Sequence, residues 1–123
     1  MPEIIFADKG DIENILKFVS AFHTLDTDEP INSDKARGQL LNYIENVSLL
    51  MAKRNGDILG VLGFDKFTDE ALRVPFVLVK EEEGLILKFR RFILNSFPKL
   101  KIITWRSDKR NEERVFKVIK KEG

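Results

Sequence analysis

The stretch from Arg73 to Leu94 has the residue pattern best suited to binding a ligand. An apolar run that ends at Val79 predicts a strand buried on both faces. After Gly84 the apolar residues recur at helical spacing, at Leu85, Phe89, Phe92 and Ile93. A helix that begins directly after a strand presents backbone N–H groups, and these bind anions such as a diphosphate. We therefore expect a ligand of this chain to lie at the turn around Gly84.

The charges of that turn oppose an anion. Lys80 is followed by Glu81, Glu82 and Glu83, and three carboxylates repel a diphosphate. A structural interpretation accounts for the same residues, because Gly84 relieves a tight corner and the glutamates stabilise the positive end of the helix dipole. A diphosphate bound here is expected to have a dissociation constant well above the micromolar range.

His23 is the only histidine of the chain, and its side chain is the one best matched to proton transfer near neutral pH. It stands between a helical pattern and the acidic loop HTLDTDEPINS, so a solvated residue at a helix end is the alternative interpretation. The chain has no cysteine. A thiolate site and a conventional zinc site are therefore not expected, and no metal is predicted.

Composition points to one domain that recognises its partners locally. The chain has 123 residues, with 21 Lys and Arg against 20 Asp and Glu, which leaves a net charge of +1. No global field attracts it to nucleic acid or to a membrane, and neither is expected as a partner. The N-terminal sequence lacks a signal-peptide pattern and no run approaches the ~20 apolar residues of a membrane span. A single cytoplasmic domain over residues 1–123 is the expectation.

The hydrophobic periodicity predicts nine elements in the order β-α-α-β-β-β-α-β-α, one layered α/β structure. Asn55-Gly56 is a strong signal for a tight hairpin, because both residues tolerate positive φ. A final helix is expected to begin at Asp108 or Asn111. The expected strands are 3–7, 48–54, 57–64, 73–79 and 101–106, and the earlier helices are 11–22, 33–44 and 85–94.

Three segments follow the element order of a known family: IIFADKGDIENILKF, MAKRNGDILGVLGF and ITWRSDKRNEERVFKVIKKEG. Pro75, which cannot donate to a β-ladder, suits a fourth strand that carries a bulge and diverges from the fifth. In these features the chain resembles the GCN5-related N-acetyltransferase (GNAT) family over essentially its whole length. The resemblance implies a three-layer α/β fold, in which a central, mostly antiparallel sheet of about five strands carries helices on both faces.

In that family, acetyl-coenzyme A lies between the fourth and fifth strands. The resemblance implies that its pantetheine arm pairs with Phe76, Val77, Leu78 and Val79, and that its diphosphate lies on Glu83, Gly84, Leu85 and Ile86. The family motif is Gln/Arg-x-x-Gly-x-Gly/Ala. With Gly84 on the first glycine, Glu81 takes the basic or amide position and Ile86 the small one, so one of the three key positions agrees.

Asp65 and Glu70 lie where the family often places a carboxylate that deprotonates an acceptor amine, and His23 is a further candidate. The tyrosine that family members often use as a general acid falls near Ile119, so water would replace it. The resemblance implies transfer of an acetyl group from acetyl-coenzyme A to a primary amine of a small molecule or peptide. The alternative is a GNAT-fold binding or structural module without activity, such as a phage-type or accessory protein. The missing glycines and the acidic turn favour that alternative.

The strand at 101–106 is expected to have a bare outer edge, because only a helix is predicted after it. Ile102, Ile103 and Trp105 would make that edge a template for another chain. A homodimer or a partner strand joined by β-augmentation is therefore the expectation. A monomer is expected instead if the second helix or the acidic loop covers this edge.

Overall fold

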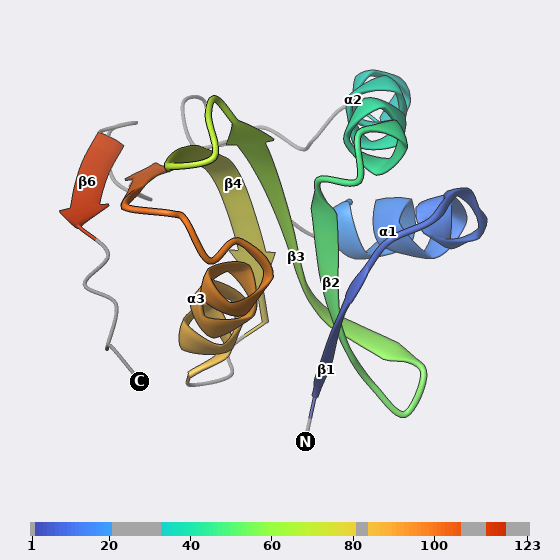
Figure 1. Cartoon of the computed structure of the whole chain (residues 1–123). Helices are drawn as coiled ribbons and strands as arrows, with labels where there is room; N and C mark the ends of the chain where they lie inside the picture. The colour runs from blue at the N-terminus through green and yellow to red at the C-terminus, as the bar shows by residue number, and fades with distance from the viewer. Residues whose placement is uncertain (1, 21–32, 81–83, 107–112, 118–123) are drawn as a thin grey trace.

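A computed structural model describes residues 2–20, 33–80, 84–106 and 113–117 of the chain (Figure 1). The predicted strands and the first three predicted helices are present, with boundaries within a few residues of those expected. The elements are β1 (Glu3–Phe6), a 3-10 turn (Lys9–Asp11), α1 (Ile12–Val19), α2 (Ser33–Glu45), β2 (Leu49–Arg54), β3 (Asp57–Lys66), β4 (Ala71–Val79), α3 (Leu85–Ser96), β5 (Ile102–Arg106) and β6 (Glu113–Lys117).

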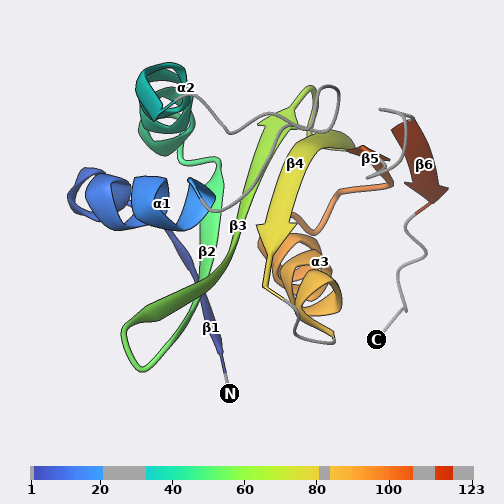
Figure 2. The ribbon, with the colours of Figure 1, turned by 180° about the vertical axis from the view of Figure 1, so that it is seen from behind.

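The strands form one sheet in the order β1-β2-β3-β4-β5-β6. All neighbouring strands are antiparallel except β4 and β5, which are parallel because α3 crosses between them. Helices α1 and α2 lie on one face of the sheet and α3 lies on the other (Figures 1 and 2). The predicted α/β layered fold, with a mostly antiparallel sheet, is confirmed. Within the described residues, no helix is long and apolar enough to cross a membrane.

Each face of the sheet has its own hydrophobic cluster. Leu49 and Met51 of β2 pack toward α1 and α2, whereas Leu50 and Ala52 pack toward α3, because successive side chains of a strand alternate. All four are fully buried. The continuous apolar run SLLMA is therefore explained by a central strand that is covered on both sides.

Local sequence signals account for the start of α1 and for the hairpin. The Asp8 carboxylate accepts a hydrogen bond from the Gly10 N–H (2.8 Å), and the Asp8 N–H donates to the Asp11 carboxylate (2.9 Å), which together form a capping box. Asn55 and Gly56 have φ values of 52° and 85°. The predicted Asn-Gly hairpin between β2 and β3 is confirmed.

The predicted final helix is wrong over its described part. Residues Glu113–Lys117 form β6, which pairs antiparallel with the whole of β5, from Ile102 opposite Lys117 to Arg106 opposite Glu113. The physical reason is the edge itself, since unpaired N–H and C=O groups on β5 are satisfied by the next segment of the same chain. Val115 and Phe116 are also good strand formers. The expectation of a bare edge is therefore wrong, and a homodimer built by β-augmentation on this edge would have to displace β6.

The phase of α1 can be tested by mutation. Leu16 is buried and Lys17 is exposed. Leu16→Ala is expected to lower the free energy of unfolding by about 2–5 kcal/mol, because it leaves a cavity against the sheet. Lys17→Ala should leave it nearly unchanged. Urea unfolding of both variants measures this, and equal losses would contradict the helix orientation.

Candidate functional site

Strands β4 and β5 separate halfway along β4. Their pairing runs from Ala71 opposite Ile102 to Val74 opposite Trp105 and ends there. Beyond it, the segment from Pro75 to Val79 continues in β4 alongside α3 (Figure 2). In the described part of the chain that segment is paired only with β3. Its other backbone edge therefore offers N–H and C=O groups to a ligand.

A bulge in β4 coincides with this separation. Gly63 pairs with Phe76 and Asp65 pairs with Arg73, so one β3 residue, Phe64, faces two residues of β4, Val74 and Pro75. An extra residue bends its strand and changes which face the following side chains occupy. The expected bulge at Pro75 is confirmed, and pairing of β4 with β5 ends at Val74, one residue before β5 itself ends at Arg106.

The predicted cofactor residues lie along the diverging segment and at the start of α3. Phe76, Val77, Leu78 and Val79 are all half-buried. Gly84 is exposed with φ of 82° and precedes α3, whose first turn contains buried Leu85 and Ile86, which is 40% exposed. The first helical hydrogen bond runs from the Lys88 N–H to the Gly84 carbonyl (3.0 Å), so the N–H groups of residues 85–87 have no acceptor within the helix. Glu83 lies outside the described residues.

The Phe76 ring covers Gly63 and also contacts an aromatic ring of α2. A methyl group at Gly63 would lie 2.5 Å from two ring atoms of Phe76, so the ring rests directly on the glycine backbone. Tyr43 of α2 meets the same ring edge-on, with centroids 5.5 Å apart and an interplanar angle of 83°. The pair positions the Tyr43 hydroxyl over β3.

The Tyr43 hydroxyl donates a hydrogen bond to Oδ2 of Asp65 at 3.4 Å. Asp65 lies on the α1/α2 face because it alternates with Val61, which belongs to the core cluster of that face. Burial and then the Asp65 carboxylate raise the pKa of the Tyr43 hydroxyl above its usual value, and Arg73 acts in the opposite direction. Tyr43 therefore keeps its proton at neutral pH.

Arg73 and Thr104 extend this polar cluster across the sheet. Arg73 pairs with Asp65 on β3 and with Thr104 on β5, and directly paired residues share a face. All three side chains are half-buried. A carboxylate, a phenol, a guanidinium and a hydroxyl thus lie beside the point where β4 and β5 separate. We call these four residues, Tyr43, Asp65, Arg73 and Thr104, the polar cluster; Asp65 is its carboxylate and Arg73 its cation.

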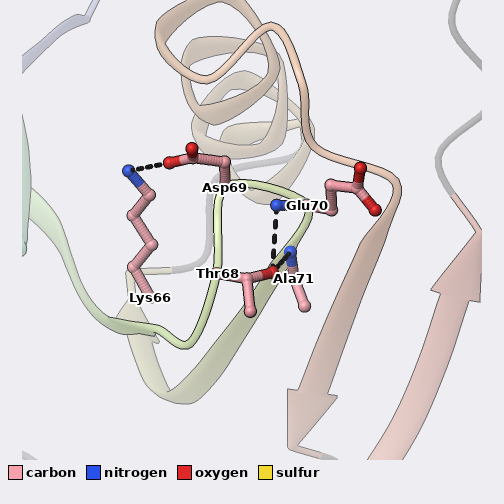
Figure 3. Close-up of polar contacts among 5 residues, drawn as sticks. All are labelled: Lys66, Thr68, Asp69, Glu70 and Ala71. Carbon is pink, nitrogen blue, oxygen red and sulfur yellow. Dashed lines mark hydrogen bonds and ion pairs between the residues drawn. The ribbon is translucent and has the colours of Figure 1, made fainter.

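Glu70 lies elsewhere, in the turn between β3 and β4 (Figure 3). The Thr68 hydroxyl oxygen accepts hydrogen bonds from the N–H groups of Glu70 and Ala71, both at 3.1 Å. Oε1 of Glu70 is 3.4 Å from the Lys101 ammonium, and the side chain is 59% exposed. The Glu70 carbonyl accepts hydrogen bonds from the N–H groups of Lys101 and Ile102. Glu70 is therefore bonded to the start of β5, whereas Asp65 is hydrogen-bonded to Tyr43.

His23 lies outside the described residues. The sequence alone did not single out Tyr43 or Arg73 as site residues. One feature of the sequence points to Arg73, namely that it is a charged residue beside a long apolar run. The face of the sheet on which Arg73 lies, however, depends on the bulge in β4. In the described part of the chain, no group of three or more acidic or histidine side chains could hold a metal ion.

Comparison with known proteins identifies the fold. No protein-family model matches the sequence, and no match was found among curated proteins. Solved structures do match: an acetyltransferase of the GNAT family from Bacillus cereus has a TM-score of 0.67 at 17% identity, over 87% of this chain and 71% of that one. The Drosophila melanogaster polyamine N-acetyltransferase has a TM-score of 0.68 at 10% identity, over 87% and 76% of the two chains. This chain has the GNAT fold.

At such identities the likeness establishes the GNAT fold alone. The N-acetylglutamate synthase of Neisseria gonorrhoeae, solved with coenzyme A and N-acetylglutamate, also matches, with a TM-score of 0.65 and 14% identity. The match covers 87% of this chain and 25% of that larger protein. The chain is a divergent example of the fold, and its activity must be argued from its own residues.

The contact between Gly63 and Phe76 can be tested with two glycine variants of this GNAT-fold chain. Gly63→Ala forces a methyl group against the Phe76 ring and is expected to cost about 1–3 kcal/mol of stability. Gly38→Ala, in the middle of α2 with nothing within 4 Å, should stabilise by about 0.5–1 kcal/mol. Chemical denaturation measures both. In a Phe76→Leu background the cost of Gly63→Ala should shrink, and an unchanged cost would disprove the contact.

Because Tyr43 is the only tyrosine, tyrosinate absorbance reports its titration alone. We expect a pKa above the usual value of about 10 in the folded protein and near it in denaturant. Asp65→Asn should lower the folded pKa while leaving it raised, because burial is the larger cause. The stability linked to neutral Tyr43 is then full below about pH 10 and lost as pH rises through the folded pKa. An unshifted pKa in the folded protein would refute this environment.

Proposed function

We propose that this protein transfers an acetyl group from acetyl-coenzyme A to a primary amine. The observation that carries the proposal is the position of Asp65, which lies beside the bulge where β4 and β5 separate and holds a hydrogen bond from Tyr43. The fold supports it, since the structures that match include acetyltransferases.

The described residues fit the cofactor through their backbone. The open edge of Phe76 to Val79 would pair with the amide groups of the pantetheine arm. The first N–H groups of α3, at Leu85 and Ile86, would bind the diphosphate. When bound, acetyl-coenzyme A supplies a thioester carbonyl that an uncharged amine can attack.

Asp65 carries the proton transfer in this proposal. Its carboxylate would bind the ammonium form of the acceptor and take one proton, so that the nitrogen lone pair becomes available. The new C–N bond would form at the thioester carbonyl as the C–S bond breaks, and water would carry the second amine proton to the leaving thiolate, which departs as the free thiol. Tyr43 remains protonated and orients the carboxylate with its hydrogen bond. Tyr43 is therefore a positioning residue, and Asp65 is the general base. Glu70 and His23 are the competing candidates from the sequence.

One observation favours an inactive GNAT-fold binding module instead. Gly84 is the only motif position retained, and Ile86 puts a branched, 40% exposed side chain where the family has a small residue. A side chain there hinders close approach of a diphosphate to the backbone. Weak binding of coenzyme A is the expected consequence, whereas complete absence of binding is the property of the inactive module.

Calorimetric titration with acetyl-coenzyme A, followed by an acetyl-transfer assay that detects the released thiol, tests the proposal. Asp65→Asn should lower kcat about 10²- to 10⁴-fold, because the general base is lost, and should leave binding of acetyl-coenzyme A unchanged. Glu70→Gln is the matched control, since it removes one carboxylate of the adjacent turn. If activity survives Asp65→Asn but falls in Glu70→Gln or in His23→Asn, then Glu70 or His23, respectively, is the general base. No binding heat and no turnover would establish the inactive module.

A further inference from the structure

A row of three paired residues crosses neighbouring strands on the α1/α2 face of the sheet. Arg73 of β4 lies directly opposite Asp65 of β3 and directly opposite Thr104 of β5. Adjacent strands are about 4.7–4.9 Å apart, so one small molecule can reach more than one of these side chains. The row presents a carboxylate, a guanidinium and a hydroxyl side by side.

Arg73 is a cation in the middle of the sheet. Its neighbours along β4, Leu72 and Val74, are buried on the α3 face. The ladders to β3 and β5 and the helix on the other face enclose the backbone of Arg73, so the exposed part of this half-buried residue belongs to its side chain. A cation partly withdrawn from water is stabilised by an anion to which it can donate hydrogen bonds.

We propose that the polar cluster binds a free α-amino acid as the acceptor, with the carboxylate of the amino acid on Arg73 and its ammonium group on Asp65. This inference rests on the proposed acetyl transfer, since it takes Asp65 as the residue that receives the amine. It narrows the substrate class from primary amines to amino acids and makes Arg73 the residue that determines specificity. The carboxylate of the acceptor forms and breaks no bond in the transfer.

The opposite charges of Asp65 and Arg73 decide which ligand fits. An ammonium ion attracted to Asp65 is repelled by the guanidinium one strand away, and a simple anion at Arg73 is repelled by the carboxylate. An α-amino acid carries both charges, with a single carbon atom between the two charged groups. Each of its charges therefore meets the opposite charge of the protein, and the two repulsions are offset.

The shape of the guanidinium suits a carboxylate. Its N–H donors form a planar fork that binds both carboxylate oxygens at once. The Thr104 hydroxyl, on the next strand, would donate a further hydrogen bond to the same group. Ile102 shares the face of Thr104, because side chains alternate along β5, and it is 41% exposed. An apolar side chain on the amino acid would contact Ile102, so leucine is a suitable probe.

The Tyr43 hydroxyl reports that both charges act in one place. It donates to the Asp65 carboxylate at 3.4 Å and so uses one of about four acceptor positions of that carboxylate. Burial and then Asp65 raise the pKa of this hydroxyl, and Arg73 lowers it. The positive charge of Arg73 is thus felt at the atom that is bonded to Asp65, as a ligand that bridges the two residues requires.

Three probe molecules of similar shape test the proposal by calorimetric binding to the unaltered protein. L-Leucine carries both charges. L-Leucinamide keeps the ammonium group and has a neutral amide in place of the carboxylate, as the N-terminus of a peptide does. 4-Methylpentanoate keeps the carboxylate and lacks the ammonium group. We expect L-leucine to bind at least about tenfold tighter than each of the others, because each of them loses charge-assisted hydrogen bonds and leaves one repulsion uncompensated.

Either of two results with these probes would overturn the proposal. If L-leucinamide binds as tightly as L-leucine, Arg73 does not bind the acceptor. If 4-methylpentanoate binds as tightly as L-leucine, Asp65 does not bind the ammonium group.

Arg73→Gln tests the specificity residue itself. The neutral side chain removes the attraction for a carboxylate and the repulsion of an ammonium group. L-Leucine should therefore bind at least about tenfold more weakly, whereas L-leucinamide should bind as well as before or better. Arg73→Lys keeps the charge without the fork, so it should weaken L-leucine less and still favour it over L-leucinamide.

Lys66→Gln is the matched control for the loss of one positive charge. Lys66 follows Asp65 in the sequence, but it pairs with Leu72, which faces α3. L-Leucine binding should be unchanged in this variant. Binding of acetyl-coenzyme A should be unchanged in all three variants, which shows that they are folded. Unchanged L-leucine binding in Arg73→Gln, or an equal loss in Lys66→Gln, would contradict the proposal.

The same probes distinguish this inference from the proposed function. If L-leucine binds with the expected preference but no acetyl transfer occurs, the transferase is rejected and the amino-acid site is retained. If L-leucine and L-leucinamide are acetylated with equal kcat/KM, and both values are unchanged in Arg73→Gln, the transferase is retained and the amino-acid site is rejected.

Discussion

Pro75 is the constraint on which the arrangement of the site depends. A proline in a strand between two neighbours cannot donate a ladder hydrogen bond, so such a strand must bulge or lose a neighbour. Strand β4 does both: a bulge holds Pro75 opposite Phe64, and pairing with β5 ends at Val74. The backbone edge beyond the proline is released from the ladder while β3 still supports it from the other side. A rigid strand with one open edge is the result.

The bulge also decides which side chains meet. Leu72 and Val74 face α3, but Phe76 and Leu78, which continue the same alternation, face α1 and α2. The extra residue reverses the phase between Val74 and Phe76. In an unbroken strand Arg73 and Phe76 would point to opposite faces, because they are three positions apart. With the bulge, Arg73 lies opposite Asp65 and Phe76 lies on Gly63, and both share the face from which Tyr43 approaches.

The parts of the fold that were predictable from the sequence are those set by local patterns. The spacing of Ile15 and Leu16 predicted α1, and Asn55-Gly56 predicted the hairpin, because helix phase and turn type depend on a few adjacent residues. The prediction of a final helix was wrong because it relied on a local charge pattern. The free edge of β5, which pairs with this segment instead, exists only once the sheet has formed. The bond between Tyr43 and Asp65 could not be predicted, since it joins residues 22 positions apart and requires α2 to lie over β3. The choice between Asp65 and Glu70 as the general base also depended on knowing that α2 lies over β3.

The end of α2 holds the residue that positions the proposed base. The Tyr43 carbonyl accepts the hydrogen bond that closes the Schellman motif around Val47, and the Tyr43 hydroxyl holds Asp65. The backbone geometry at Val47 and the position of the tyrosine are thus parts of one helix terminus. Tyr43 lies in the last turn of α2, so the bonds that end the helix also fix the backbone of the residue that holds Asp65. Val47, in the left-handed conformation with φ of 53°, therefore belongs to the same helix end as the residue that positions the proposed base.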